Sequence, residues 1–162
     1  NVLQSVSCVS VSFCVATGIQ NSGSGSQTLV EHWNGSVWST VTSPSPGTSY
    51  NVLYSVSCVT VSFCVATGTQ NSGSNNLTLV EQWNGSVWST VTSPNPGTTG
   101  NVLYSVSCVS VSFCVATGIQ YSGSSNQPLY ETLVLSLTGP VPPTTTTTTT
   151  DDSGSVVPAF TG

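Results

Sequence analysis

Three near-copies of one 50-residue unit follow one another along this chain of 162 residues. Each copy opens with NVLxSVSCVxVSFCVATG, at Asn1, Asn51 and Asn101. The first two copies continue to TLVExWNGSVWSTVTSPxPG and differ from each other at about ten of fifty positions. A fixed period of this length is typical of arrays whose units bury their apolar faces by stacking on one another. A catalytic site is normally built from unlike residues, so the repetition favours a structural or binding role.

The composition excludes several kinds of partner. The chain has no lysine and no arginine, and its groups that titrate near neutrality are five carboxylates and His32. Nucleic-acid binding needs cations against the phosphates, phosphate ligands need an arginine clamp or a P-loop lysine, and anionic lipid needs a basic patch. No stretch is long and apolar enough to span a bilayer. We therefore expect no nucleic-acid partner and no membrane insertion.

Six cysteines occupy the same two positions in every copy. A pair that repeats with the array suggests one local disulfide per unit and an oxidising, extracellular setting, with about 2 kcal/mol of stabilisation for each bridge. The alternative is reduced, buried thiols in a cytosolic repeat protein. Cys-x5-Cys is wider than zinc-knuckle spacing and no histidine accompanies each pair, so we expect neither a metal nor a cofactor. The predicted pairs are Cys8 with Cys14, Cys58 with Cys64, and Cys108 with Cys114.

The residue types predict an all-β chain with four short antiparallel strands in each full unit. Val, Thr, Ser, Phe, Tyr and Trp prevail, and good helix formers are almost absent. A Gly/Ser/Asn-rich loop is expected from Gln20 to Gln27, and a type I′ turn at Asn34-Gly35. The strands expected in the first unit are Val2 to Cys8, Ser12 to Gly18, Thr28 to Trp33 and Ser36 to Thr42.

Two hairpin signatures carry a resemblance to a known repeat. Ser7 to Gly18 has the pattern S-C-x5-C-x-A-x-G, Trp33 to Trp38 has the pattern W-N-G-x-x-W, and both return in the second copy. Together they resemble an extracellular, β-propeller-like repeat of secreted and surface proteins of actinobacteria and related bacteria. The resemblance covers about residues 1–135 and implies tandem propeller-like blades, but no particular activity.

The third copy departs from the pattern after Gly123. We interpret Glu131 as the counterpart of Glu31 and Glu81, with Leu133 in place of the tryptophan, and no Asn-Gly turn follows. The third unit is therefore expected to lack its fourth strand and to leave an open apolar edge, to be paired by another chain, by the tail or by a missing part of the protein. The residues of this edge strand are Tyr130, Leu133, Leu135 and Leu137.

The chain divides into repeat units at residues 1–50 and 51–100, an incomplete repeat at 101–139 and a Pro/Thr-rich extended tail at 140–162. Thr/Pro-rich tracts are O-glycosylated stalks or plain spacers. The final residues Pro158 to Gly162 are similar to a sortase sorting signal of the L-A-x-T-G or L-P-x-T-G type, with Pro158 where that signal has leucine. The candidate O-glycosylation residues are Thr144, Thr145, Thr146, Thr147, Thr148, Thr149 and Thr150.

The four tryptophans allow two interpretations. Aromatic rings stack on sugars in lectins, and they also form packing layers between adjacent blades. We favour blade packing over glycan stacking for Trp33, Trp38, Trp83 and Trp88.

The carboxylates and the histidine invite interpretation as a site. Glu31, Glu81 and Glu131 would bind Ca²⁺ if they surrounded an axis, but one exposed carboxylate per unit is the simpler interpretation. His32 has no Asp or Cys partner in a recognisable arrangement, so we expect it to face solvent. No catalytic residue is predicted.

These features predict an extracellular, non-enzymatic, disulfide-stapled β-repeat protein of the cell surface. The favoured role is structural, as a self-assembling subunit of a fibre or wall-associated layer whose partner is another copy of itself. The alternative is a lectin-like or adhesive propeller on a stalk, which binds glycan or cell wall.

Overall fold

The chain is all-β, as predicted. The structure, a computed structural model, describes residues 1–23, 25–124, 127–137 and 144–146. Within these ranges no helix is present that could cross a bilayer. The first unit contains β1 (Val2–Ser10), β2 (Phe13–Ser22), β3 (Gly25–Trp33) and β4 (Trp38–Thr40); the second contains β5 (Asn51–Thr60), β6 (Phe63–Ser72), β7 (Asn75–Trp83) and β8 (Trp88–Val91); the third contains β9 (Gly100–Ser110), β10 (Phe113–Ser124), β11 (Gln127–Leu137) and β12 (Thr144–Thr146).

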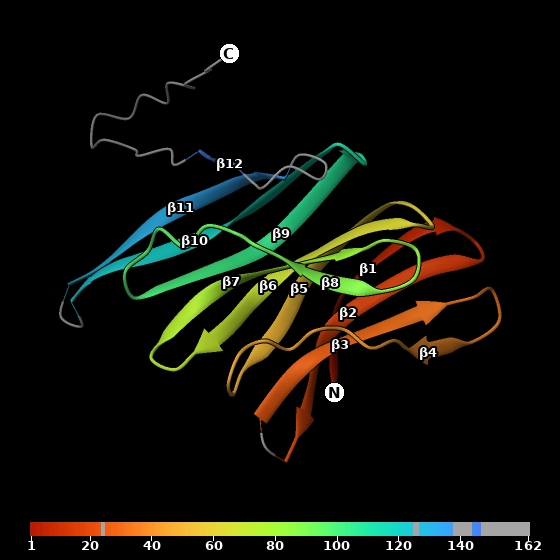
Figure 1. The fold of residues 1–162 in the computed structure, drawn as a ribbon, viewed down its shortest axis with the longest axis horizontal. Helices are drawn as coiled ribbons and strands as arrows, with labels where there is room; N and C mark the ends of the chain where they lie inside the picture. The colour runs from red at the N-terminus through yellow and green to blue at the C-terminus, as the bar shows by residue number, and fades with distance from the viewer. Residues whose placement is uncertain (24, 125–126, 138–143, 147–162) are drawn as a thin grey trace.

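Each unit is an antiparallel sheet in which strands that follow one another in sequence are neighbours. The units succeed one another along the molecule, from the red and orange strands of the first to the blue-green strands of the third (Figure 1). Single parallel pairs join one unit to the next, Ser26 with Tyr50 and Asn76 with Gly100. The units therefore meet through their faces and not through a shared ladder of hydrogen bonds.

The first hairpin of every unit sets its two cysteines in direct register. Cys8 lies opposite Cys14 across β1 and β2, and the other two units repeat this pairing. All three predicted disulfides are present, each between residues six apart in sequence. Because such a bridge spans only the end of one hairpin, it fixes the pairing of two strands within a unit.

A β-bulge follows the third residue of each unit. The ladder passes from Leu3 to Ser5 and leaves Gln4 unpaired; Tyr54 and Tyr104 occupy the same place in the other units. A bulge twists its strand and re-aims the unpaired side chain. Gly18 lies across from the bulge, and a Cβ there would overlap the carbonyl oxygen of Val2, so this position requires glycine.

The structure corrects two predicted connections. The segment from Gln20 to Gln27 is mostly strand, because β2 runs to Ser22 and β3 begins at Gly25. Polar residues here pair across a hairpin, and the turn is tight because Ser22 pairs directly with Gly25, whose φ is 144°. The polar composition of this segment was interpreted as a loop, but its residues form the tip of a hairpin.

The turn between β3 and β4 is longer than predicted. Trp33 pairs with Trp38, so four residues separate the strands. The Oδ1 atom of Asn34 accepts hydrogen bonds from the backbone N–H groups of Ser36 and Val37, and Gly35 has a φ of 94°. No described non-glycine residue has a positive φ, so the predicted type I′ turn is wrong. The asparagine side chain closes this turn.

The third unit has a longer central hairpin than the other two. Cys114 pairs with Leu137, whereas Cys14 pairs with Trp33. Leu137, and not Leu133, therefore stands at the tryptophan position. By the same register Leu135 stands where the first two units have glutamate, and Glu131 lies four residues before it. The predicted alignment of Glu131 was wrong because the hairpin gained two residues on each strand.

The third unit also has a fourth strand. Thr144–Thr146 pairs antiparallel with β11, opposite Val134, Leu135 and Ser136 (Figure 1). The described part of the incomplete repeat at 101–139 supplies three strands, and the tail pairs its open edge, which is one of the three alternatives predicted. An unpaired edge exposes backbone donors and acceptors to any extended segment nearby, and β-branched threonine suits a strand. Residues 147–162, with Thr147–Thr150 and the sorting-signal resemblance, lie outside the described residues.

Of the four residues predicted for the open edge, two are core residues. Leu133 and Leu135 are fully buried, because they share the face of β11 that packs on the second unit. Leu137 is half-buried, and Tyr130 is exposed near the tip of the long hairpin.

Candidate functional site: the faces between repeat units

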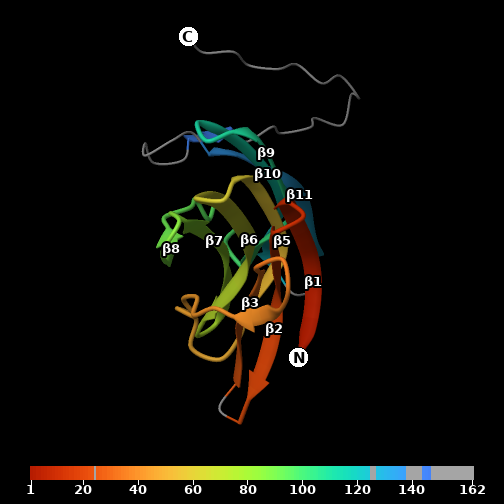
Figure 2. The same cartoon turned by 90° about the vertical axis from the view of Figure 1, so that its right-hand side faces the viewer.

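The apolar core of the molecule lies between its units. The middle unit uses one face of its sheet against the unit before it and the other face against the unit after it. We call the face toward the following unit the forward face and the face toward the preceding unit the rear face. Seen from the side in Figure 2, the first unit lies at one end of the molecule and the third at the other.

The two interfaces use equivalent positions. At the first, Val15 and Val30 of the forward face of unit 1 pack against Leu53, Val56, Cys64, Ala66, Leu79, Trp83 and Trp88 of the rear face of unit 2. At the second, Val65 and Val80 pack against Leu103, Val106, Cys114, Ala116, Leu133 and Leu135 of unit 3. The pattern follows from the period of two in a strand, since alternate side chains point to opposite faces.

Serine hydroxyls add hydrogen bonds to both interfaces. The Oγ atoms of Ser5 and Ser7 accept from the backbone N–H groups of Val56, at 3.2 Å, and Cys58, at 3.0 Å. Ser55 and Ser57 accept in the same way from Val106 and Cys108. Sequence reasoning missed this role of the repeated S-V-S motif, although the motif was visible in all three copies.

The buried tryptophans belong to the first interface. Trp83 and Trp88 are nearly fully buried on the rear face of unit 2. The Nε1–H group of Trp83 donates to the carbonyl oxygen of Val61, and that of Trp88 donates to Nε2 of His32. Of the two interpretations of these rings, packing between units fits their positions, and neither ring face is free to stack on a sugar. Trp33 and Trp38 occupy the equivalent positions on the rear face of unit 1.

The prediction that His32 faces solvent is wrong. It shares the forward face of β3 with Val30, and its ring lies edge-on to Trp83, with 4.7 Å between centroids. Burial lowers the pKa of His32 below its usual value. Because Nε2 accepts the hydrogen bond from Trp88, the neutral imidazole is the form that fits this contact.

Glu81 is a fully buried carboxyl on the rear face of unit 2, between Leu79 and Trp83 in sequence. Neither carboxyl oxygen has a hydrogen-bond partner of normal geometry. Burial raises the pKa of Glu81 to about 8, and the nearby Ser43 hydroxyl offsets this in part. The prediction of an exposed carboxylate is wrong at this position, because neighbouring strands of two units cover it.

The three glutamates do not form a calcium site. Glu31 is half-buried and Glu131 is exposed, and the register of β11 takes Glu131 out of line with the other two. In the part of the chain that the structure describes, no group of three potential metal ligands occurs.

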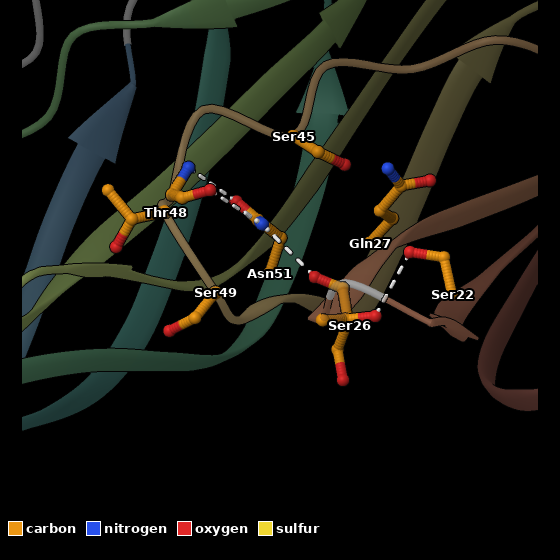
Figure 3. A pocket seen from close by; sticks show the side chains of 9 residues that line it. Ser22, Ser26, Gln27, Ser45, Thr48, Ser49 and Asn51 are labelled. Carbon is orange, nitrogen blue, oxygen red and sulfur yellow. Dashed lines mark hydrogen bonds between the residues drawn. The ribbon is translucent and has the colours of Figure 1, made fainter.

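A polar joint connects the linker of unit 1 to both neighbouring sheets. The side-chain amide of Asn51 donates to the carbonyl oxygens of Gly47 and Ser26, and its oxygen accepts from the Gly47 N–H group (Figure 3). These groups line a cavity of about 70 Å³. The polar atoms of Asn51 are therefore occupied by the chain itself, which makes this a structural joint.

All five tyrosines of the chain form one continuous run. Hydroxyl groups meet between Tyr50 and Tyr54, at 3.4 Å, and between Tyr104 and Tyr121, at 3.5 Å. Ring centroids lie 5.5 Å apart for Tyr54 and Tyr104 and 5.3 Å apart for Tyr121 and Tyr130. The β-bulges place Tyr54 and Tyr104 in this run, which crosses the second and third units. Three of the rings are substantially exposed.

A scan against models of known protein families and a search of curated proteins both returned no match for this chain. The fold and the faces define an all-β, disulfide-bonded protein of stacked repeat units. Its three disulfides indicate an oxidising environment.

Proposed function

We propose that this protein is an extracellular structural building block that associates with copies of itself in a fibre or wall-associated layer at the cell surface. One observation carries the proposal: the repeat unit binds copies of itself, forward face to rear face, at both internal interfaces. A surface that already joins units within a chain supplies the contacts to join units of different chains. The protein is then a scaffold and not an enzyme.

The composition supports this role. The chain carries no lysine or arginine and few carboxylates, so little charge repulsion opposes the approach of two copies. Burial holds the pKa of Glu81 near 8, which reduces the negative charge further at neutral pH. Disulfides within each unit would preserve the sheets outside the cell.

Pairing through an open strand edge has less support than association through faces. The backbone of β11 at Val134, Leu135 and Ser136 is already paired with β12. A neighbouring chain would have to displace that strand before it could add its own. Faces of the sheets at the two ends of the molecule need no such exchange.

Negative-stain electron microscopy of the unreduced protein, with light scattering to give its mass, tests this function. Filaments, sheets or masses of many chains are expected. A uniform particle of one or two chains at all concentrations would contradict a fibre or layer.

The run of tyrosines favours a second candidate, an adhesive module that binds a neutral glycan. Tyrosine presents a rigid apolar ring with a hydroxyl at its edge and is enriched at binding surfaces. Retention on glycan resin tests this candidate. Tyr104→Ala should abolish retention, whereas Gln4→Ala, at the same bulge of the first unit but outside the run, should not. Equal retention of the two variants would exclude the tyrosines as the binding surface.

A further inference from the structure

We infer that two chains join head to tail: the forward face of unit 3 of one chain binds the rear face of unit 1 of a second copy. This inference rests on the proposed self-association and names its surfaces. The contacts are those that already join unit 1 to unit 2 and unit 2 to unit 3. The partner is therefore another copy of this chain.

The two outer strands of the rear face of unit 1 are exposed at positions that are buried in the other units, while the centre of this face, at Cys14, Ala16 and Leu29, is buried within the chain itself. Leu3 is 48% exposed, whereas its counterpart Leu53 is fully buried. Val6 is 59% exposed, and its counterpart Val56 is only 6% exposed.

The tryptophans sharpen this comparison. Trp38 is 43% exposed on unit 1, and Trp88 at the same position of unit 2 is 5% exposed. The two rings have the same sequence around them and the same cross-strand partner, Trp33 or Trp83. What differs is that the preceding unit covers Trp88.

The forward face of unit 3 is uncovered in the complementary way. Thr117 is exposed, whereas Thr17 and Thr67 are fully buried against the next unit. Phe113 is 44% exposed, and the forward-face residue Val115 is half-buried where Val15 is fully buried. The two ends of one molecule therefore present the two halves of the same interface.

The hydrogen bonds of the internal interfaces have free counterparts at the two ends. Ser105 and Ser107 of unit 3 are exposed and occupy the positions of Ser55 and Ser57, which accept from the next unit. Their donors in the second chain would be the backbone N–H groups of Val6 and Cys8. Two chains that dock with the geometry of the internal interfaces therefore gain hydrogen bonds as well as buried apolar contacts.

A contact between unlike faces is heterologous, so it either closes into a ring or continues as an open filament. Two chains of three units would close a ring of about six units, within the usual range of four to eight for a propeller. A rotation that does not close would give a filament. Both products use the same interface, and the mass of the assembly distinguishes them.

Two variants, each with a lysine that blocks one of the two end faces, test the inference; we call them capped variants. Val6→Lys places a charge on the rear face of unit 1, and Thr117→Lys places one on the forward face of unit 3. Both side chains are exposed within one chain, so each variant should fold, as circular dichroism will show. Leu3→Lys provides a second, independent block of the rear face. Val11→Lys and Val111→Lys are matched controls, because their counterpart Val61 stays 54% exposed in the middle unit, where both faces are covered.

Each capped variant alone should remain monomeric in light scattering at concentrations where the native chain and both controls assemble. Mixed together, Val6→Lys and Thr117→Lys should form a one-to-one dimer and stop, because only one pair of unblocked faces is left. This result supports the head-to-tail interface. If each variant alone still forms large assemblies, the inference is overturned while self-assembly itself stands.

The mass of the native chain separates the inference from the proposed function. Discrete two-chain particles that both caps abolish would support the head-to-tail interface and contradict a fibre. A native chain that stays monomeric up to millimolar concentration would contradict both. Filaments that the caps abolish would support both.

Discussion

The two interfaces inside this molecule join the same faces of the repeat, yet they bury different side chains. The first contains Trp83, Trp88 and the carboxyl of Glu81, with His32 against the tryptophan rings. The second has Leu135 at the glutamate position and Leu137 at the first tryptophan position. The stack therefore depends on which positions point inward and on the serine hydrogen bonds that both interfaces share.

Glu81 is the weak point of the first interface. A buried polar group without a hydrogen bond destabilises the folded state by about 1–3 kcal/mol, and a charged one by more. Leu135 removes that penalty from the second interface. The large aromatic surfaces buried beside Glu81 offset it in the first. Substitutions that exchange these features test how far the two interfaces are equivalent.

The largest effect is expected when a buried carboxyl like that of Glu81 is introduced into the second interface, which has leucine at that position. Leu135→Glu should destabilise the protein by about 5 kcal/mol at pH 9 and by about 3 kcal/mol at pH 4, where the carboxyl is protonated. Urea unfolding at the two pH values measures this. A loss below about 1 kcal/mol at both would show that the second interface is open to water.

Truncation of one tryptophan compares a covered face with an uncovered one. Trp88→Ala should destabilise the chain by about 3–5 kcal/mol, because it leaves a cavity in the first interface. Trp38→Ala, in the same local sequence, should lower the stability of the monomer by less than about 1 kcal/mol, since that ring is already exposed. Thermal unfolding of dilute samples compares them. Equal losses would refute the assignment of Trp88 to an interface.

Removal of the buried carboxyl should make the first interface resemble the second. The folded-state pKa of Glu81 is raised to about 8 from its usual 4.5. Between these pH values the folded state keeps a proton that the unfolded chain has lost. The contribution of the Glu81 carboxyl to the free energy of unfolding therefore falls as pH rises from about 4.5 to 8.

Glu81→Leu should therefore stabilise the protein by about 5 kcal/mol at pH 9 and by less than about 0.5 kcal/mol at pH 4, because a shift of this size corresponds to about 4–5 kcal/mol. The difference in unfolding free energy between native chain and variant, followed across this range, isolates the carboxyl from all other titrating groups. A difference that does not change with pH would mean that Glu81 ionises freely.

The smallest effect concerns the feature that the two interfaces share. Ser5→Ala removes the acceptor for Val56 at the first interface, and Ser55→Ala removes the acceptor for Val106 at the second. Each should lower stability by about 1 kcal/mol. Chemical unfolding of both variants should give equal losses. A clear loss in only one of them would show that one interface is held by side-chain packing alone.

Local features of the fold could be predicted from the sequence. The abundance of β-forming residues predicted the strands, and a pair of cysteines six residues apart that recurs in every unit, such as Cys8 and Cys14, predicted the disulfides, because both depend on neighbours within one hairpin. The tight hairpin turn before Gly25 was predicted as a loop, since composition identifies polarity and not pairing.

Burial of the site residues could not be predicted in the same way. Glu31 and Glu81 lie in the same sequence context, and only the stacking of units makes one half-buried and the other fully buried. In the third copy the residues Thr132 to Val134 repeat the TLV of the first two copies. That match would have placed Leu135 correctly, but the isolated Glu131 suggested a different alignment.

The location of the disulfides has a consequence for the order in which the chain folds. Six cysteines allow 15 pairings, and three identical sequence contexts give no chemical preference among them. Each native pair is separated by only six residues. A loop this short closes within about 10–100 ns, well before distant units find each other. Each hairpin therefore brings its own two cysteines together before those of distant units can meet, which protects three near-identical units from exchanging their partners.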